Sequence, residues 1–259
     1  MTPLELDPDA FVDAVPAFLW PLFRIGATLA LVPGIGGAEV PVRVRVGLAV
    51  ALTLALAPTL PPPPAVDPLS AAGALVTASE LAVGFAGALV VVVAFNAVTL
   101  AGESIAVTMG LGFALMNDPR NGVQVPTVSQ FYLLMATLLF FALDGHHAVL
   151  ALLAGSFVAL PVGAGLDDDA LATLLGFAAT MFAGALGVAL PALAAMLATN
   201  VAMGIVTRAA PQLNLFSVGF PVTMLVGFLA LLVTLPAFGE SVTALFARAA
   251  RTLDLVLGG

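Results

Sequence analysis

The sequence predicts an all-α membrane protein, and three observations support this prediction. Hydrophobic residues make up 61% of the 259 positions and charged residues only 8%, against about 25% charged in a typical soluble domain. The mean hydropathy of +1.16 leaves too little polar sequence to cover a water-facing surface. Uncharged stretches reach the length of a membrane-spanning helix, and no run of short alternating segments typical of a membrane β-barrel is seen.

The charge balance excludes several classes of function. Fifteen acidic residues outnumber seven basic ones, all of them arginine, so the net charge is −8. This excludes a nucleic-acid partner, which requires a basic surface, and the sequence has no polybasic segment for anionic lipid. Because cysteine is absent, disulfides and thiolate metal sites are excluded. Acidic residues such as Glu5, Asp7 and Asp9 make the N-terminus unlike a signal peptide.

Charged residues and breaker residues divide the chain into segments. Phe18–Val32 contains a single charge, Arg24, and ends at the glycine-rich turn Pro33–Gly37. Val46–Ala57 has 12 residues, about 18 Å as a helix, and alone is too short for a hydrocarbon core of about 30 Å. The four-proline linker Pro61–Pro64 is expected to be extended.

The middle of the chain holds three longer apolar segments. Leu81–Gly102 is uncharged for 22 residues, and this context favours a helix over a strand at its valine run, Val90–Val93. A connector with glycine, asparagine and proline, Gly110–Pro126, follows it. The uncharged segments Asn121–Leu143 and Ala148–Leu166 have 23 and 19 residues and are also predicted to be helical.

The stretch Ala170–Thr207 is uncharged for 38 residues, about 57 Å as one straight helix. We expect it either to kink at Pro191 or to extend beyond the bilayer among protein partners. Small residues suit close contact with partner helices. They include Gly176, Ala178, Ala179, Ala183, Gly184, Ala185 and Gly187. A turn is expected at Ala209–Phe220, before the last apolar segment, which makes about six segments in all.

The arginines indicate an orientation in the membrane. Arg43, Arg45, Arg120 and Arg208 fall in alternate connections, whereas acidic residues fall in the others. The positive-inside rule places the arginine-bearing connections in the cytoplasm. With six crossings, the two arginines of the C-terminal tail would lie on the opposite side.

Motifs for catalysis or cofactor binding are missing from the sequence. His146 and His147 are the only histidines, and as neighbours on a helix they are expected to point about 100° apart, unlike the i, i+4 pair of a zinc peptidase. Gly110-Leu111-Gly112 lacks the rest of a dinucleotide fingerprint, and no nucleophile elbow or phosphate loop is present. We therefore expect no enzyme activity, no metal and no cofactor.

Three charges lie within or beside apolar segments: Arg24, Glu80 and Glu103. Each would cost about 2.5–3.5 kcal/mol at the centre of a lipid-exposed helix. We therefore expect them to face protein or water. A structural role in buried pairs is favoured over an ion path, because three scattered charges do not form a proton relay.

Several motifs follow one another along nearly the whole chain. The longest are Ala101-Gly102-Glu103-Ser104-Ile105 with Met109–Ala114, Asp118-Pro119 and Val125-Pro126, and the stretch Arg208–Pro221. The others are Trp20–Arg24, Val40–Arg45, Phe140–His146 and Leu160–Gly163. In this order and spacing the motifs resemble the FliR family of flagellar and other type III secretion export gates.

This resemblance implies an export-gate subunit that forms a channel for unfolded flagellar substrates across the inner membrane. The implied partners are FliP-type and FliQ-type subunits, FlhB-type and FlhA-type export proteins, the unfolded substrates and membrane lipid. Residues 1–166 would be a FliP-like part and residues 167–259 a FliQ-like helical hairpin with a C-terminal tail. The alternatives are a virulence-type (injectisome) gate subunit and a stand-alone polytopic transporter or channel. An intramembrane enzyme would need a catalytic pair, which the sequence does not show.

The resemblance also implies two sites. A connector over residues 110–125 would plug the pore, since apolar side chains at a constriction exclude water and glycines let the loop move. Its candidate residues are Gly110, Gly112, Phe113, Leu115, Met116 and Asp118. A turn between two FliQ-like helices would face the FlhB-type partner. Its candidate residues are Arg208, Pro211, Gln212, Asn214, Gly219 and Pro221.

Overall fold

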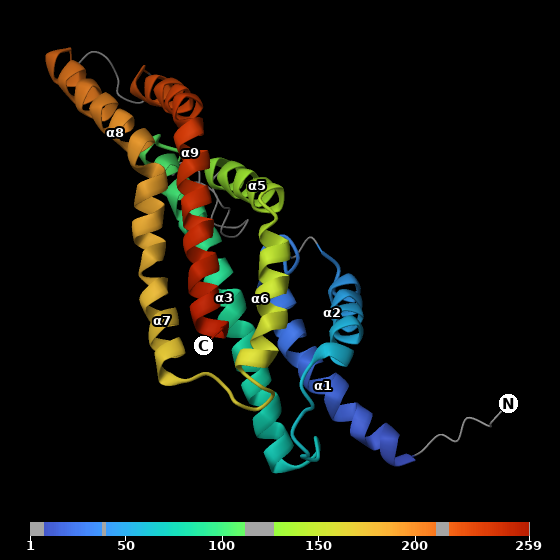
Figure 1. Ribbon diagram of the computed structural model, residues 1–259. Coiled ribbons are helices and arrows are strands. Elements are labelled where there is room, and N and C mark those ends of the chain that lie inside the picture. Colours follow the sequence, from blue (N-terminus) through green and yellow to red (C-terminus); the bar gives the residue numbers. More distant parts are fainter. Residues whose placement is uncertain (1–7, 38–39, 112–126, 211–217, 259) are drawn as a thin grey trace. The chain divides into compact units, whose positions relative to one another are not determined.

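The computed structural model describes residues 8–37, 40–111, 127–210 and 218–258, with the backbone alone for residues 8–14. All regular elements in these ranges are helices (Figure 1). They are α1 (Pro8–Leu31), α2 (Val42–Leu56), the short 3₁₀ helix η1 (Ala57–Thr59), α3 (Ala71–Thr108), α5 (Thr127–Ala142), α6 (Gly145–Ala159), α7 (Asp168–Ala178), α8 (Thr180–Ala209) and α9 (Phe220–Leu257). The predicted all-α class is confirmed.

The chain forms two compact units that interleave along the sequence. The first unit contains Met1–Val92, Asp144–Ala178 and Arg248–Gly259, and the second contains Val93–Leu143 and Ala179–Ala247. The long helices α3 and α9 therefore each contribute residues to both units. These units are defined by spatial contacts and do not test the expected junction near Leu166, which stays a prediction.

The core of the first unit joins α1, α2 and α6. Ile25 and Leu29 of α1 pack with Ala49 of α2 and with Leu153 and Phe157 of α6. Helices α1 and α2 lie side by side in this unit (Figure 1). Trp20, the single tryptophan of the chain, is also fully buried here.

The second unit has an aromatic core. The rings of Phe95 (α3), Phe140 (α5) and Phe246 (α9) contact one another at centroid distances of 5.1 to 5.4 Å, within the range preferred by aromatic pairs. Tyr132, the single tyrosine, is buried with its ring 4.5 Å from that of Phe238. These contacts hold α3, α5 and α9 together.

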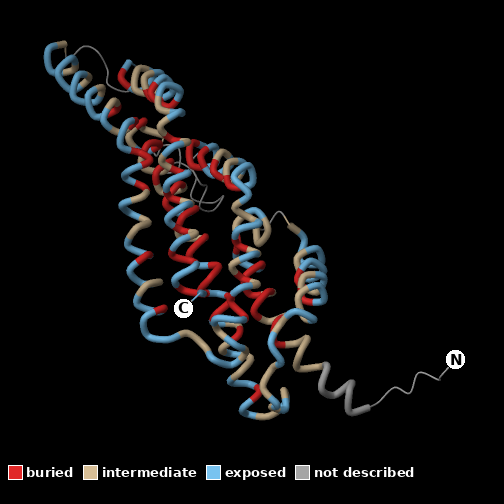
Figure 2. Tube along the Cα trace, in the orientation of Figure 1, coloured by how far each residue is buried: buried red, intermediate tan, exposed pale blue. Residues whose placement is uncertain are grey.

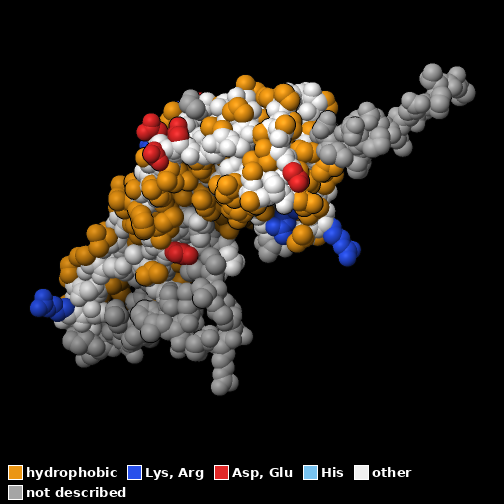
Figure 3. Space-filling model, turned by 90° about the horizontal axis from the view of Figure 1, so that it is seen from below, with side chains coloured by type: hydrophobic (Ala, Val, Ile, Leu, Met, Phe, Trp, Pro, Cys, Tyr) orange, Lys and Arg blue, Asp and Glu red, His pale blue; other side chains and the backbone are white. Residues whose placement is uncertain are grey.

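Helix α8 shows the opposite pattern, because much of its apolar surface is uncovered (Figure 2). Six large apolar side chains at intervals of four or seven residues are each more than half exposed, and we call them the α8 stripe. They are Phe182, Leu186, Leu190, Leu197, Val201 and Ile205. Figure 3 shows apolar side chains spread over one face of the molecule with few charged groups between them. Such a surface needs lipid or protein to cover it.

Four helical stretches among the described residues are long and apolar enough to cross a membrane: Val42–Thr59, Ala71–Thr108, Asp168–Ala209 and Phe220–Leu257. The number becomes five if α5 and α6 form one broken span. The predicted count of about six segments stays a prediction. As expected, Pro33–Gly37 is a turn, Pro61–Pro64 has no regular structure, and the valine run Val90–Val93 is helical.

One boundary prediction was wrong. The second apolar segment is not limited to Val46–Ala57, because helix α2 already begins at Val42 and continues into η1. Its arginines therefore lie in the first turn of the helix rather than in a preceding loop. The long stretch after Asp169 is one apolar span, Asp168–Ala209, in which the regular helix is interrupted at Ala179 and Pro191 lies inside α8. The expected kink at Pro191 stays a prediction.

Candidate functional site

A buried ion pair joins two helices of the first unit. The Nε of Arg24 in α1 donates to Oε2 of Glu80 in α3 at 2.8 Å, and Nη2 donates to Oε1 at 2.9 Å. Both side chains are fully buried. This bidentate geometry is the strongest form of an arginine–carboxylate pair, and both charges face protein.

The remaining hydrogen-bonding groups of the pair hold the end of α6 and the loop after it. Arg24 donates from Nη1 to the carbonyl and hydroxyl of Ser156 (3.0 and 3.2 Å) and from Nη2 to the carbonyl of Leu160 (2.9 Å). The N–H of Gly163 donates to Oε1 of Glu80 at 3.0 Å. The guanidinium also lies over the ring of Phe157, 4.3 Å from its centroid, a favourable cation–π position.

The pair therefore links two motifs that are distant in sequence, Trp20–Arg24 and Leu160–Gly163. Gly163 has φ of +89°, a conformation that suits glycine, so the loop can present its N–H to the carboxylate. Glu103 does not join this network. It belongs to the second unit, where it is half-buried and has no hydrogen-bond partner among the described side chains.

A cleft in the second unit brings the two longest motifs together. Its volume is about 380 Å³. The lining comes from the end of α3, from α8 and from the start of α9. The residues are Val107, Thr108, Gly110, Asn200, Met203, Gly204, Thr207, Gly219, Phe220 and Thr223. Gly110, Gly219 and Phe220 belong to the quoted motifs, so the structure places parts of both predicted sites at one cleft.

Helix α3 ends at this cleft in a Schellman motif. The N–H of Gly110 donates to the carbonyl of Val107 and the N–H of Leu111 to that of Ala106, both at 3.0 Å, which is the pattern of this helix end. Gly110 has φ of +83°, and a Cβ atom on it would lie 3.2 Å from the ring of Phe220. Glycine is therefore required here by both conformation and space.

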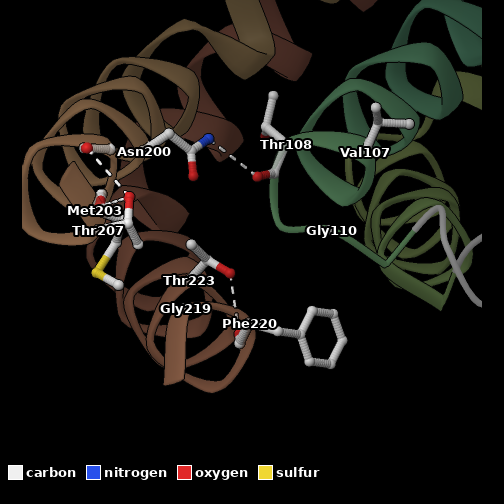
Figure 4. Close-up of a pocket in the computed structure, with 10 residues that line it drawn as sticks. Val107, Thr108, Gly110, Asn200, Met203, Thr207, Gly219, Phe220 and Thr223 are labelled. Atoms are coloured by element: carbon white, nitrogen blue, oxygen red, sulfur yellow. Dashed lines mark hydrogen bonds between the residues drawn. The ribbon is translucent and has the colours of Figure 1, made fainter. Parts of the chain in front are cut away.

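Polar side chains tie the three cleft elements together (Figure 4). Nδ2 of Asn200 points from α8 to the carbonyl of Thr108 at 3.3 Å. Oγ1 of Thr223 in α9 donates to the carbonyl of Phe220 at 3.0 Å and lies 3.4 Å from that of Met109. These contacts satisfy carbonyls at the end of α3, which the helix itself leaves unpaired.

Asp144, His146 and His147 form a cluster at the start of α6. The two imidazole rings lie with centroids 3.9 Å apart, so the expectation that they point in different directions was wrong. His147 Nδ1 lies 3.1 Å from Oδ1 of Asp144, and one ligand atom from each residue lies within 4.8 Å of the others. Such donors suit a transition metal, but the imidazole–carboxylate hydrogen bond explains their arrangement equally well.

The predicted site residues divide between described and undescribed parts of the chain. Gly112, Phe113, Leu115, Met116 and Asp118 of the plug, and Pro211, Gln212 and Asn214 of the turn, lie outside the described residues. Arg208 is exposed in the last turn of α8, where a cation suits the helix dipole. Gly219 is buried and Pro221 is exposed at the start of α9. Sequence reasoning missed Asn200 and Thr223, which no motif marks.

Comparison with known proteins identifies relatives over nearly the whole chain. The family model described as "Bacterial export proteins, family 1" matches residues 15–249. The chain is 36% identical to the flagellar biosynthetic protein FliR of Pectobacterium carotovorum subsp. carotovorum, covering 92% of this chain and 91% of that protein. It is 32% identical to the FliR protein of Escherichia coli K12 (95% and 94% covered) and 30% identical to that of Bacillus subtilis 168 (96% and 97% covered).

Proposed function

Because this chain belongs to the family of bacterial export proteins that includes the flagellar biosynthetic protein FliR, we propose that it is a core subunit of the flagellar type III protein export gate. It is a multi-pass protein of the bacterial inner membrane, located in the flagellar basal body. The relatives described above are all named as flagellar proteins, which favours this system over an injectisome.

The single structural observation that supports the proposal is the α8 stripe. A helix of 30 residues spans about 45 Å, longer than the hydrocarbon core of about 30 Å, yet apolar side chains are exposed along most of it. Lipid alone covers only part of such a length. The surface is therefore suited to helices of other subunits, as in a multi-subunit channel.

We assign the covering helices to FliP-type and FliQ-type subunits, with FlhB-type and FlhA-type proteins as further partners and unfolded flagellar proteins as the transported substrates. The exposed Arg208 and the turn after it are proposed to contact the FlhB-type subunit. The connector 110–125 is proposed to close the pore when no substrate is present, through Phe113, Leu115 and Met116.

The proposed gate subunit performs no chemistry and binds no cofactor or nucleotide; energy comes from other components of the export machine. A stand-alone ion-coupled transporter would require ionisable groups free to change their protonation. Arg24 and Glu80, by contrast, neutralise each other in a buried pair with further hydrogen bonds. This arrangement supports a structural role for these charges.

Deletion of the gene tests the proposed function. In the deletion strain we expect flagellar proteins to be absent from the medium and swimming to be lost, with both restored by the wild-type gene. A tagged chain should also retain FliP-type and FliQ-type subunits through purification in mild detergent. Continued secretion in the deletion strain, or coupled solute uptake by the chain alone in liposomes, would exclude a gate subunit.

A further inference from the structure

A groove of about 340 Å³ lies between α1 and α2 in the first unit, outside both sites described above. Four residues of each helix line it: Leu22, Phe23, Gly26 and Ala30 from α1, and Val42, Arg45, Val46 and Ala49 from α2. The intervals within each set place its members on one helix face. Seven of the eight are apolar, and the eighth is an arginine.

Arg45 has unused hydrogen-bonding capacity in this groove. Its Nη1 donates to the carbonyl of Gly36 at 3.1 Å, which holds the guanidinium at the α1–α2 turn. Its Nε is buried and has no acceptor within the described part of the chain. Among the described residues no acidic side chain lines the groove, and the first turn of α2 contains none. A buried N–H without an acceptor is unfavourable, so an anionic oxygen at this place would stabilise the structure.

We propose that the groove binds one anionic phospholipid, with an acyl chain between α1 and α2 and the phosphate on Arg45. Charge complementarity favours a phosphate, and the apolar lining favours an acyl chain. The floor of the groove is Ala49, which packs with Ile25 and Leu29. The two helices are therefore already in contact beside the groove.

The position of Arg45 along the chain agrees with this occupant. Arg43 and Arg45 lie in the first turn of α2, next to a connection that the positive-inside rule places in the cytoplasm, and the cytoplasmic leaflet contains anionic lipids that attract such groups. The α2–η1 stretch Val42–Thr59 is apolar enough to lie in the membrane, but only 11% of its residues are buried. Lipid therefore has access to this side of α2.

Two substitutions separate the head-group contact from the acyl-chain contact. Arg45→Gln removes the charge and keeps a polar side chain. Gly26→Leu fills the groove, since a Cβ atom on Gly26 meets nothing within 4 Å and the backbone need not move. Arg248→Gln is the matched control, because it removes one exposed arginine far from this groove in sequence and leaves the groove lining unchanged.

The experiment is native mass spectrometry of the full chain, purified with its co-expressed gate partners, in micelles with equal amounts of phosphatidylglycerol and phosphatidylcholine. We expect one retained phosphatidylglycerol and a preference over phosphatidylcholine that falls about fivefold in Arg45→Gln, the effect of one arginine on an anionic lipid. Gly26→Leu should lower retention of both lipids. The control should behave as the wild type.

Four results would overturn the proposal. The first is equal retention of the two lipids by the wild type. The second is an unchanged preference in Arg45→Gln. The third is displacement of the bound lipid by glycerol 1-phosphate as efficiently as by intact phosphatidylglycerol, since the apolar groove would then contribute nothing to the affinity. Loss of partner subunits in Gly26→Leu with unchanged lipid retention would identify a protein as the occupant and would also exclude the lipid.

Discussion

Arg24 and Glu80 are 56 positions apart in the sequence, yet their side chains form a fully buried pair through two hydrogen bonds of 2.8 and 2.9 Å. The same guanidinium binds the carbonyls of Ser156 and Leu160. One arginine therefore connects α1, α3 and the end of α6. Its removal would leave a carboxylate and two carbonyls without their donor.

The first prediction concerns this pair. Arg24→Met should destabilise the chain by about 3–5 kcal/mol, because Glu80 becomes an uncompensated buried charge. The double variant Arg24→Met/Glu80→Leu should lose less than the sum of the two single variants, since it leaves no unpaired charge. Thermal unfolding in detergent measures the loss of stability in each single variant and in the double variant, with Arg251→Met, at an exposed position, as control. Additive losses would show that the two side chains do not depend on each other.

The second prediction concerns the end of α3 at the cleft. Gly110→Ala should destabilise the second unit by about 1–2 kcal/mol, because an L-residue is strained at this positive φ. Gly110→Asn should be milder, since asparagine adopts the left-handed conformation more readily. Gly155→Ala is the control, as a Cβ atom there meets nothing within 4 Å. The unfolding temperature and the motility should be highest for Gly155→Ala, lower for Gly110→Asn and lowest for Gly110→Ala. A Gly110→Ala variant with the same unfolding temperature as the control would contradict this prediction.

The third prediction separates folding from assembly at two glycines of α8. A Cβ atom on Gly184 would lie 3.1 Å from Leu245, whereas one on Gly187 meets no atom of the described residues within 4 Å. Gly184→Leu should therefore overpack the second unit and destabilise it by about 1–3 kcal/mol. Gly187→Leu should leave the isolated chain stable but reduce the amount of purified complex, because it adds bulk to the proposed partner surface.

The yield of complex and the unfolding temperature, measured on the same variants, distinguish these two effects. A normal yield of complex with Gly187→Leu would argue against burial of this side of α8 by partner subunits. An unchanged unfolding temperature with Gly184→Leu would show that α8 moves away from Leu245 without cost.

The fourth prediction tests the connector 110–125 as a plug. Replacement of Phe113, Leu115 and Met116 by alanine should raise the ion conductance of the assembled gate in planar bilayers, since smaller apolar side chains exclude water less well from a constriction. Assembly should remain normal. Leu69→Ala is the control, because this side chain is exposed in a different connection. A conductance equal to that of the wild type would reject the plug.

The helical fold and the buried charges were predictable, since both follow from local composition. A 22-residue uncharged stretch favours a membrane-spanning helix, and a charge within or beside an apolar segment needs a partner. The choice of Glu80 as the partner of Arg24 was not predictable, because no periodicity relates residues 56 positions apart. The same holds for Asn200 and Thr223, whose roles depend on which helix ends meet at the cleft.

The interruption of the regular helix at Ala179 shows a second limit. Pro191 stood out because it lacks an N–H, and α8 continues through it, whereas the interruption falls on Ala179, between Ala178 and Thr180. Alanine has the highest helix propensity, so no local pattern marks this position.

The buried aromatic residues have a practical consequence for spectroscopy. The chain has one tryptophan and one tyrosine, and Trp20 lies in the core of the first unit whereas Tyr132 lies in the core of the second. Each unit therefore contains its own intrinsic fluorophore. Selective excitation of tryptophan reports the environment of the first unit, and the tyrosine signal of a Trp20→Phe variant reports the second. The loosening of each unit during denaturation can thus be followed separately, without any introduced label.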